Sequence, residues 1–257
     1  MDIVIPALTA LLASLLTFFS GFGLGTILTP AFMIFFPADL AIGMTAVVHF
    51  FNNLFKLLLT GKYADRDTLF RFGIPAVIAA LAGSWLMVYL TDLPVLFSYD
   101  FLGRTNSVSA IKLTVSVILI LVALTEILPS FDRLAFDRSK LPLGGLLSGF
   151  FGGLTGNQGA LRSAFLIKAG LSKEAFIGTA VVVSTFVDLT RLSIYSRNIL
   201  SSELTANLPV LLTAIASAIC GAWLGNTFLK KITLQTLKTI VTVMLILLSL
   251  AMGSGML

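Results

Sequence analysis

The chain has 257 residues, of which 57% are hydrophobic and only 11% are charged, whereas soluble domains carry roughly 25% charged residues. This composition excludes an ordinary water-soluble domain and predicts an integral membrane protein. The net charge of +5 does not indicate nucleic-acid binding, because the basic residues are dispersed between apolar runs instead of clustering with aromatic ones. The apolar runs lack the strict alternation of barrel strands, so we expect an all-α polytopic fold.

The first apolar segment, 3–36, is interrupted by the glycine-rich sequence GFGLGTILTP at 21–30. Asp2, just before this segment, is an acid where a signal peptide carries basic residues, and the segment lacks a typical cleavage site, so we expect the segment to be retained. Residues 26–36 after the glycines make a helix of about 16 Å, about half a bilayer core. We therefore predict a re-entrant helical hairpin over 3–36, followed by transmembrane helices over 40–60, 73–91 and 108–128.

The second half repeats this order after a predicted cytoplasmic linker, 129–140. A hairpin over 141–170 is interrupted by TGNQGALRSA at 155–164, and transmembrane helices over 174–196, 204–229 and 236–255 follow. The sequence GMTAVVHFFNNLFK at 43–56 aligns without gaps with GTAVVVSTFVDLTR at 178–191, pairing Asn53 with Asp188 and Lys56 with Arg191. The alignment predicts two repeats, 1–128 and 141–257; chance similarity between two apolar helices is the alternative.

The basic residues outside the membrane decide between two topologies. If every segment crosses once, they divide seven and seven, which contradicts the positive-inside rule. If each broken segment returns to its starting face, eleven lie on one side and three, Arg104, Lys112 and Arg197, on the other. This second topology predicts inverted repeats, with both termini in the periplasm of a cell whose inner membrane holds the protein.

The two glycine-rich tips would meet near the bilayer midplane, where broken backbone is tolerated only inside protein or around a cavity. Free N–H groups at the starts of the half-helices favour an anion. Arg162 would supply charge, although it could instead snorkel to the basic face, and the glycines could serve only for helix packing. The predicted substrate-binding residues are Gly23, Gly25, Thr26, Gly156, Asn157, Gln158, Gly159 and Arg162.

A second set of polar residues lies on the helices that follow the tips. His49, the sole histidine, could carry protons or simply pack, and Asp188 and Arg191 could form a structural pair three residues apart. Lys56 is expected to snorkel, Cys220 to be a small buried residue, and Gly83 to tolerate alanine in an uninterrupted helix. The predicted coupling or gating residues are His49, Asn52, Asn53, Asp188 and Arg191.

The sequence resembles the TauE/SafE-like permeases, bacterial exporters of sulfite and organosulfonates. The resemblance rests on GFGLGTILTP followed by GMTAVVHFFNNL, and on their echo in GGLTGNQGALRSAFLIKAGLSKEAFIGTAVVVS. It implies transport of small sulfur-containing anions such as sulfite or sulfoacetate, driven by the proton gradient and without a bound cofactor. Related thiosulfate-uptake proteins use membrane cysteines, and a single cysteine at position 220 disfavours that chemistry.

We therefore expect a secondary anion transporter with protons as the coupling ion, no metal, and alternating access around the tips. An anion-selective channel or a carrier of small carboxylates is the alternative, and coupled transport distinguishes a carrier from a channel. An enzyme is disfavoured because the sequence shows no convergent His, Glu and Asp residues and no nucleophile with a base. The sequence leaves open whether the chain forms a homodimer.

Overall fold

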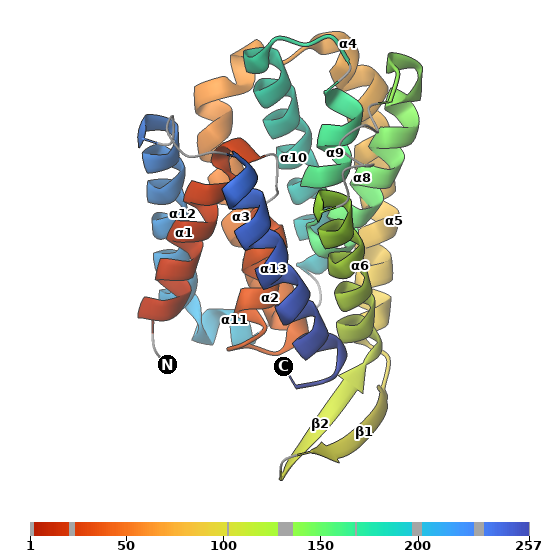
Figure 1. The fold of residues 1–257 in the computed structure, drawn as a ribbon, viewed down its shortest axis with the longest axis vertical. Helices are drawn as coiled ribbons and strands as arrows, with labels where there is room; N and C mark the ends of the chain where they lie inside the picture. The colour runs from red at the N-terminus through yellow and green to blue at the C-terminus, as the bar shows by residue number, and fades with distance from the viewer. Residues whose placement is uncertain are drawn as a thin grey trace.

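The computed structural model describes residues 3–20, 24–101, 103–127, 136–167, 169–196, 202–228 and 234–256. Figure 1 shows a helical bundle with a small β-hairpin at the end where both termini lie. The first half contains α1 (Val4–Ser20), α2 (Leu24–Phe32), α3 (Ala38–Thr60), α5 (Ile74–Thr91) and α6 (Ala110–Ile127). The second contains α8 (Leu141–Thr155), α9 (Gly159–Leu166), α10 (Lys173–Tyr195), α12 (Leu208–Phe228) and α13 (Leu234–Gly253).

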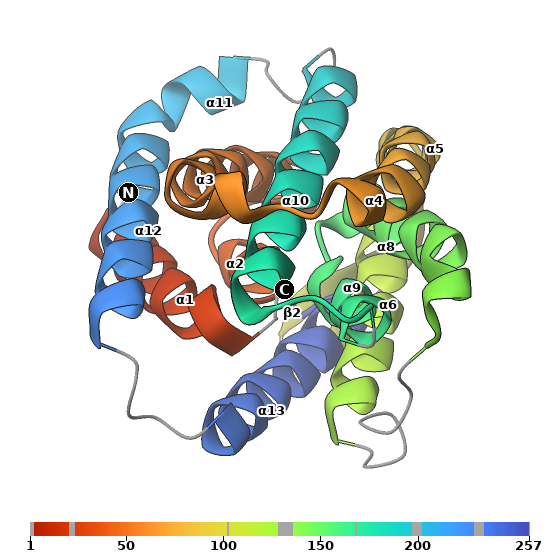
Figure 2. The ribbon, with the colours of Figure 1, turned by 90° about the horizontal axis from the view of Figure 1, so that it is seen from above.

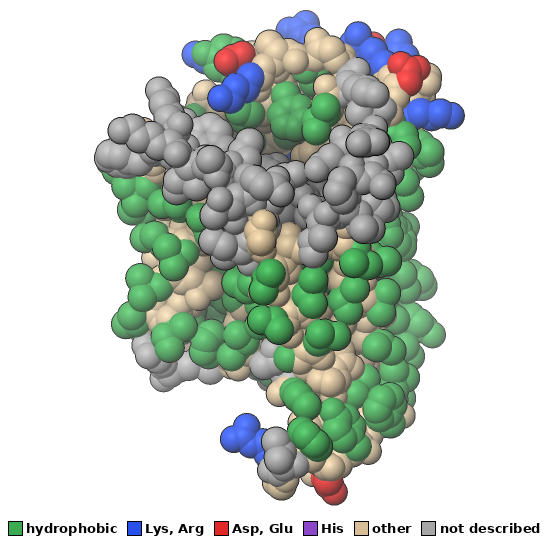
Figure 3. Space-filling view, in the orientation of Figure 1, with side chains coloured by type: hydrophobic (Ala, Val, Ile, Leu, Met, Phe, Trp, Pro, Cys, Tyr) green, Lys and Arg blue, Asp and Glu red, His purple; other side chains and the backbone are tan. Residues whose placement is uncertain are grey.

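Each predicted apolar segment is a helix or, at the two glycine-rich sequences, a pair of helices. Four helical stretches of the described chain are long and apolar enough to cross a membrane: Ala38–Tyr63, Arg66–Thr91, Lys173–Tyr195 and Leu208–Gly225. Shorter apolar helices cover Val4–Thr17, Ala110–Leu124 and Thr242–Gly253. Figure 3 shows apolar side chains along the body of the bundle, between ends that carry the charged ones.

Two local features differ from the expected plain helices. Residues Val95–Phe101 (β1) and Arg104–Ser109 (β2) form an antiparallel hairpin with Gly103 at φ +73° in its turn. In β1, Val95, Phe97, Tyr99 and Phe101 occupy alternate positions, a strand signal that a search for long apolar runs misses. The third long helix also begins early, because α4 (Arg66–Thr68) and the π-helix η2 (Leu69–Gly73) continue directly into α5.

Short elements complete the connections at the two ends of the bundle. These are η1 (Gly61–Tyr63), η3 (Arg138–Lys140) and α11 (Ser202–Ala206). Seen along the bundle, α2, α3 and α10 lie between α12 and α1 on one side and α5, α8 and α6 on the other (Figure 2). The interior position of α3 and α10 puts their polar side chains in the core.

Close contacts between the two halves depend on glycine. A Cβ on Gly83 of α5 would collide with the carbonyl oxygen of Phe150 in α8, and one on Gly149 would collide with Ala76. A Cβ on Gly221 of α12 would likewise collide with the carbonyl oxygen of Leu11 in α1. Such close approach is typical of small residues in membrane helices. The expectation that Gly83 tolerates alanine is therefore wrong, because the neighbouring backbone leaves no room.

Cys220 also differs from its expectation. Its side chain is exposed on the outside of the bundle, beside the buried Gly221 and Ala222. In a membrane-spanning helix the outer face meets lipid, where a small apolar residue needs no protein partner. The prediction that Cys220 is buried in the protein is wrong.

Candidate anion site

The start of α2 meets the break between α8 and α9 inside the bundle. A Cβ on Gly25, near the start of α2, would lie 3.1 Å from the carbonyl oxygen of Gly156, between α8 and α9. Gly156 caps α8 in the left-handed conformation, with φ +81°, and its N–H donates to the carbonyl of Gly152 at 2.9 Å. Gly25 of the first predicted tip therefore lies against Gly156 of the second. Gly23 and the side chain of Thr26 lie outside the described part of the chain.

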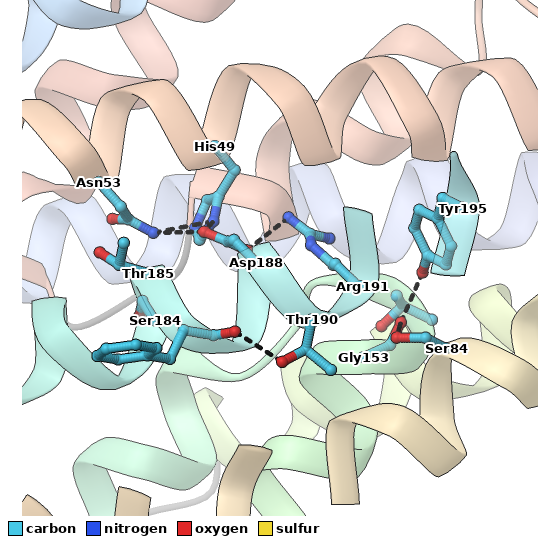
Figure 4. Close-up of polar contacts among 12 residues, drawn as sticks. His49, Asn53, Ser84, Gly153, Ser184, Thr185, Asp188, Thr190, Arg191 and Tyr195 are labelled. Carbon is cyan, nitrogen blue, oxygen red and sulfur yellow. Dashed lines mark hydrogen bonds and ion pairs between the residues drawn. The ribbon is translucent and has the colours of Figure 1, made fainter. Parts of the chain in front are cut away.

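Asp188 on α10 is the centre of a buried polar cluster (Figure 4). Its Oδ2 lies 2.6 Å from Nδ1 of His49 and accepts a hydrogen bond of 2.7 Å from Nδ2 of Asn53, both on α3. Its Oδ1 forms an ion pair of 2.9 Å with Nη2 of Arg191. The carboxylate thus joins α3 to α10 and is shared between a histidine and an arginine.

Arg191 is completely buried, and its guanidinium lies directly against the second helix break. A Cβ on Gly156 would lie only 2.5 Å from Nη1 of Arg191. Nε and Nη1 have no hydrogen-bond partner in the described structure. The predicted ion pair of Asp188 with Arg191 exists. Arg191 also places two unsatisfied donors, Nε and Nη1, beside the break between α8 and α9.

Two further cations lie inside the protein. Arg162, in the first turn of α9, is 8% exposed and donates to Oγ of Ser184 on α10, while its Nε has no partner. Lys56 on α3 is 9% exposed, and its Nζ lies 3.2 Å from the Asn52 side-chain oxygen when that amide also donates to Ala218. Neither side chain extends to the surface, so the snorkelling alternative for Arg162 and the expectation for Lys56 are wrong.

The amides of the second tip are also buried. Nδ2 of Asn157 donates to Oγ1 of Thr155 at 2.9 Å, whereas its Oδ1 has no partner. Neither amide atom of Gln158 has a partner, although the side chain is fully buried against Gly152. Gly159 is buried as the first residue of α9. Buried polar groups are nearly always satisfied, so these orphan atoms mark a place suited to a polar ligand.

The charges of this region do not balance. Among the described residues, the buried side chains with formal charge are Lys56, Arg162, Arg191 and Asp188, and His49 adds another positive charge only when it is protonated. With a neutral histidine the sum is +2. Burying charge is costly, and Arg162 and Arg191 keep donors without a partner among the described residues, so a bound anion would stabilise this arrangement. In the same described ranges no three His, Cys, Asp or Glu side chains gather as metal ligands do.

Sequence reasoning missed three residues that hold the site together. Ser184 binds Arg162, and it is the repeat partner of His49 in the alignment of 43–56 with 178–191, which could have identified it. Tyr195 donates to the carbonyl of Gly153 at 2.5 Å, and Ser84 donates to the same oxygen at 3.2 Å. These hydroxyls satisfy a carbonyl near the end of α8, which the helix break leaves without its usual partner.

The comparison with protein families gives one match. The model of the sulfite exporter TauE/SafE family matches residues 6–252. The chain belongs to this family. No curated protein and no solved structure matches it significantly. TauE/SafE proteins are membrane transporters, so the buried cluster lies inside a multi-pass permease, in agreement with the resemblance seen in the sequence.

Proposed function

We propose that this protein is a proton-coupled exporter of small sulfur-containing anions such as sulfite or sulfoacetate, which bind where the two helix breaks meet. The observation that carries the proposal is the excess of buried positive charge at that place. Among the described residues three buried cations accompany one buried carboxylate, and donors of Arg162, Arg191 and Gln158 have no partner in that part of the protein. A doubly charged oxyanion matches the sum of +2 and has oxygens for several donors.

Proton coupling is supported by the position of Asp188 between His49 and Arg191. One carboxylate oxygen faces the histidine at 2.6 Å and the other faces the guanidinium at 2.9 Å. The protonation state of the His49–Asp188 pair therefore decides how strongly Arg191 is held by protein and how freely it can bind an anion. Asn53 fixes the same carboxylate oxygen at 2.7 Å.

Alternating access is supported by the way that the halves contact each other. Contact between α5 and α8 has its repeat counterpart in contact between α12 and α1, and α3–α10 and α6–α13 join equivalent helices. Asn53 and Asp188, equivalent in the alignment, touch directly. These contacts are those expected for repeats related by a two-fold axis, and the central site lies between elements that could rock against each other.

The topology that we propose puts both termini in the periplasm of a bacterial cell, with the chain in the inner membrane. Figure 1 shows both termini at the end that carries β1 and β2, opposite α4. The end with α4 also carries Arg138, which forms an ion pair with Asp67 of α4, and with it Lys140 of η3, in agreement with the charge count. Reporters active in only one compartment, fused to each terminus, should give the same periplasmic signal, and opposite signals would exclude inverted repeats.

The substrate assignment is tested by thermal-shift binding with sulfite, sulfoacetate, taurine, sulfate and small carboxylates. Arg162→Ala should weaken binding of the preferred anion about 10- to 100-fold, because a hydrogen bond to a charged group contributes about 1.5–3 kcal/mol. Lys140→Ala, which removes an exposed cation, is the matched control and should bind normally. Normal anion binding and transport by the Arg162 variant would show that the anion does not bind at the tips.

Counterflow in proteoliposomes distinguishes the carrier from the channel alternative. A carrier should accelerate uptake of labelled anion when unlabelled anion is present on the opposite side, and a proton gradient should change net accumulation. Current without either effect would support an anion-selective channel with the same site.

A further inference from the structure

An apolar groove of about 650 Å³ lies on the outer side of the bundle, away from the anion site. It is formed by α10 and by the continuous helical stretch of α4, η2 and α5, which pack against each other (Figure 2). The volume is in the range of sites that bind small molecules. Residues that line it include Arg66, Phe70, Ile74, Ile78, Val182 and Phe186.

The π-helix contributes to the shape of this groove. Leu69 and Gly73 of η2 both line it, and a Cβ on Gly73 would approach Val183 of α10 to 3.3 Å. The wide turn therefore brings the backbone close to α10 at one point and leaves Phe70, 68% exposed, at the rim. Single π-helical turns occur frequently at functional sites. The groove opens sideways, toward the bilayer.

Arg66 gives the groove a charged end. It is the first residue of the span Arg66–Thr91 and is exposed, which places it at the boundary between membrane and water. Its neighbours Arg71 and Arg138 each form an ion pair with Asp67, at 2.9 and 3.0 Å. Among the described residues Arg66 has no such carboxylate partner within 4.0 Å. An apolar groove thus ends in an unpaired cation at headgroup level.

We propose that this groove binds an anionic phospholipid, with an acyl chain between α5 and α10 and the phosphate on Arg66. Basic sites between membrane helices are suited to anionic headgroups, and the apolar walls match a hydrocarbon chain. A second copy of the chain fits less well, because a two-fold axis along the membrane normal would bring Arg66 toward its own equivalent. A zwitterionic lipid would lack the net charge that Arg66 complements.

The lipid would also contact the back of the anion site. Val182, Val183 and Phe186 line the groove on α10, while Ser184 and Asp188 of the same helix face the buried cluster. A chain in the groove therefore supports the helix that positions Asp188 from the opposite side. We expect bound anionic lipid to raise the transport rate without contributing an atom to the substrate site.

The test is native mass spectrometry of the purified full-length protein with phosphatidylglycerol and phosphatidylcholine of identical acyl chains. Arg66→Gln should lower the affinity for phosphatidylglycerol about fivefold and that for zwitterionic phosphatidylcholine much less. Val182→Phe fills the groove and should weaken both lipids. Arg71→Gln, which removes a cation from the same helical stretch outside the groove, is the control and should bind both lipids normally.

Each other outcome overturns the proposal. Unchanged phosphatidylglycerol affinity in Arg66→Gln would show that Arg66 does not bind the headgroup. Unchanged lipid binding in Val182→Phe would show that the lipid does not occupy the groove. Equal binding of glycerol phosphate, which has no acyl chain, would show a site for free phosphate instead. Loss of a dimer mass in Val182→Phe, with lipid binding retained, would show that a second copy occupies the groove. Melting temperatures near that of the parent establish that Arg66→Gln is folded.

Discussion

Gly156→Ala should damage the anion site more than it damages the fold. The residue has φ +81°, and a left-handed conformation costs a residue with a Cβ about 1 kcal/mol. The new Cβ would also lie 2.5 Å from Nη1 of Arg191, about 1 Å inside a normal contact distance. The guanidinium must move by about that amount, which disrupts its 2.9 Å ion pair with Asp188. Since hydrogen bonds to charged groups contribute about 1.5–3 kcal/mol, anion affinity should fall about 10- to 100-fold.

A matched control separates the two effects of this change. Gly170 has φ +73°, but a Cβ there would have no atom within 4 Å. Gly170→Ala should therefore lose a similar amount of stability from its backbone alone and retain anion binding. Melting temperature and anion affinity of both variants, measured in the same detergent, give the comparison. If Gly156→Ala binds anion as tightly as Gly170→Ala, the guanidinium of Arg191 is not held against the helix break as described.

Two further predictions concern packing and pH. Gly83→Ala should destabilise the protein by about 1–3 kcal/mol, because its Cβ collides with the Phe150 backbone, and an unchanged melting temperature would contradict this packing. Hydrogen bonds from the side chain and the N–H of Thr68 lower the pKa of Asp65 at the start of α4. The ionised Asp65 therefore stabilises the fold fully above its unfolded pKa of about 4. This stabilisation is lost as the pH falls through the lower pKa of the folded state. Asp65→Asn keeps the cap but cannot titrate, so its melting temperature should approach that of the parent as pH falls below 4, and a constant gap would refute the pKa shift.

The helices themselves could be predicted because membrane insertion constrains the sequence strongly. The lengths of the apolar segments predicted every long helix. The glycine clusters at 21–25 and 156–159 predicted both interruptions, since exposed backbone at membrane depth must be enclosed by protein. The repeat alignment also brought Asn53 and Asp188 to equivalent positions, and the structure places them 2.7 Å apart. These features depend on local chemistry or on repetition, both of which are visible in one sequence.

The remaining features depend on neighbours that are distant in sequence. Lys56 was expected at the surface, but Asn52 binds its ammonium group inside the bundle. Gly83 looked replaceable because nothing in its own segment indicates that the Phe150 backbone touches it. Tyr195 caps a carbonyl 42 positions earlier, and neither residue type nor spacing suggests this bond. Such pairings arise from the packing of whole helices, which periodicity within one helix cannot specify.

The exchange of helix partners between halves has a consequence for how the protein is made. Helix α1 packs chiefly against α12, and the contact of Leu11 with Gly221 joins residues that the ribosome supplies far apart in time. During synthesis α1 must therefore wait in the membrane, without its final neighbour, until almost the whole chain has been inserted. Chains usually acquire structure from the N-terminus onward as they emerge. Here the first helix is among the last to reach its final packing, so truncation near the C-terminus should expose the start of the chain to proteolytic quality control.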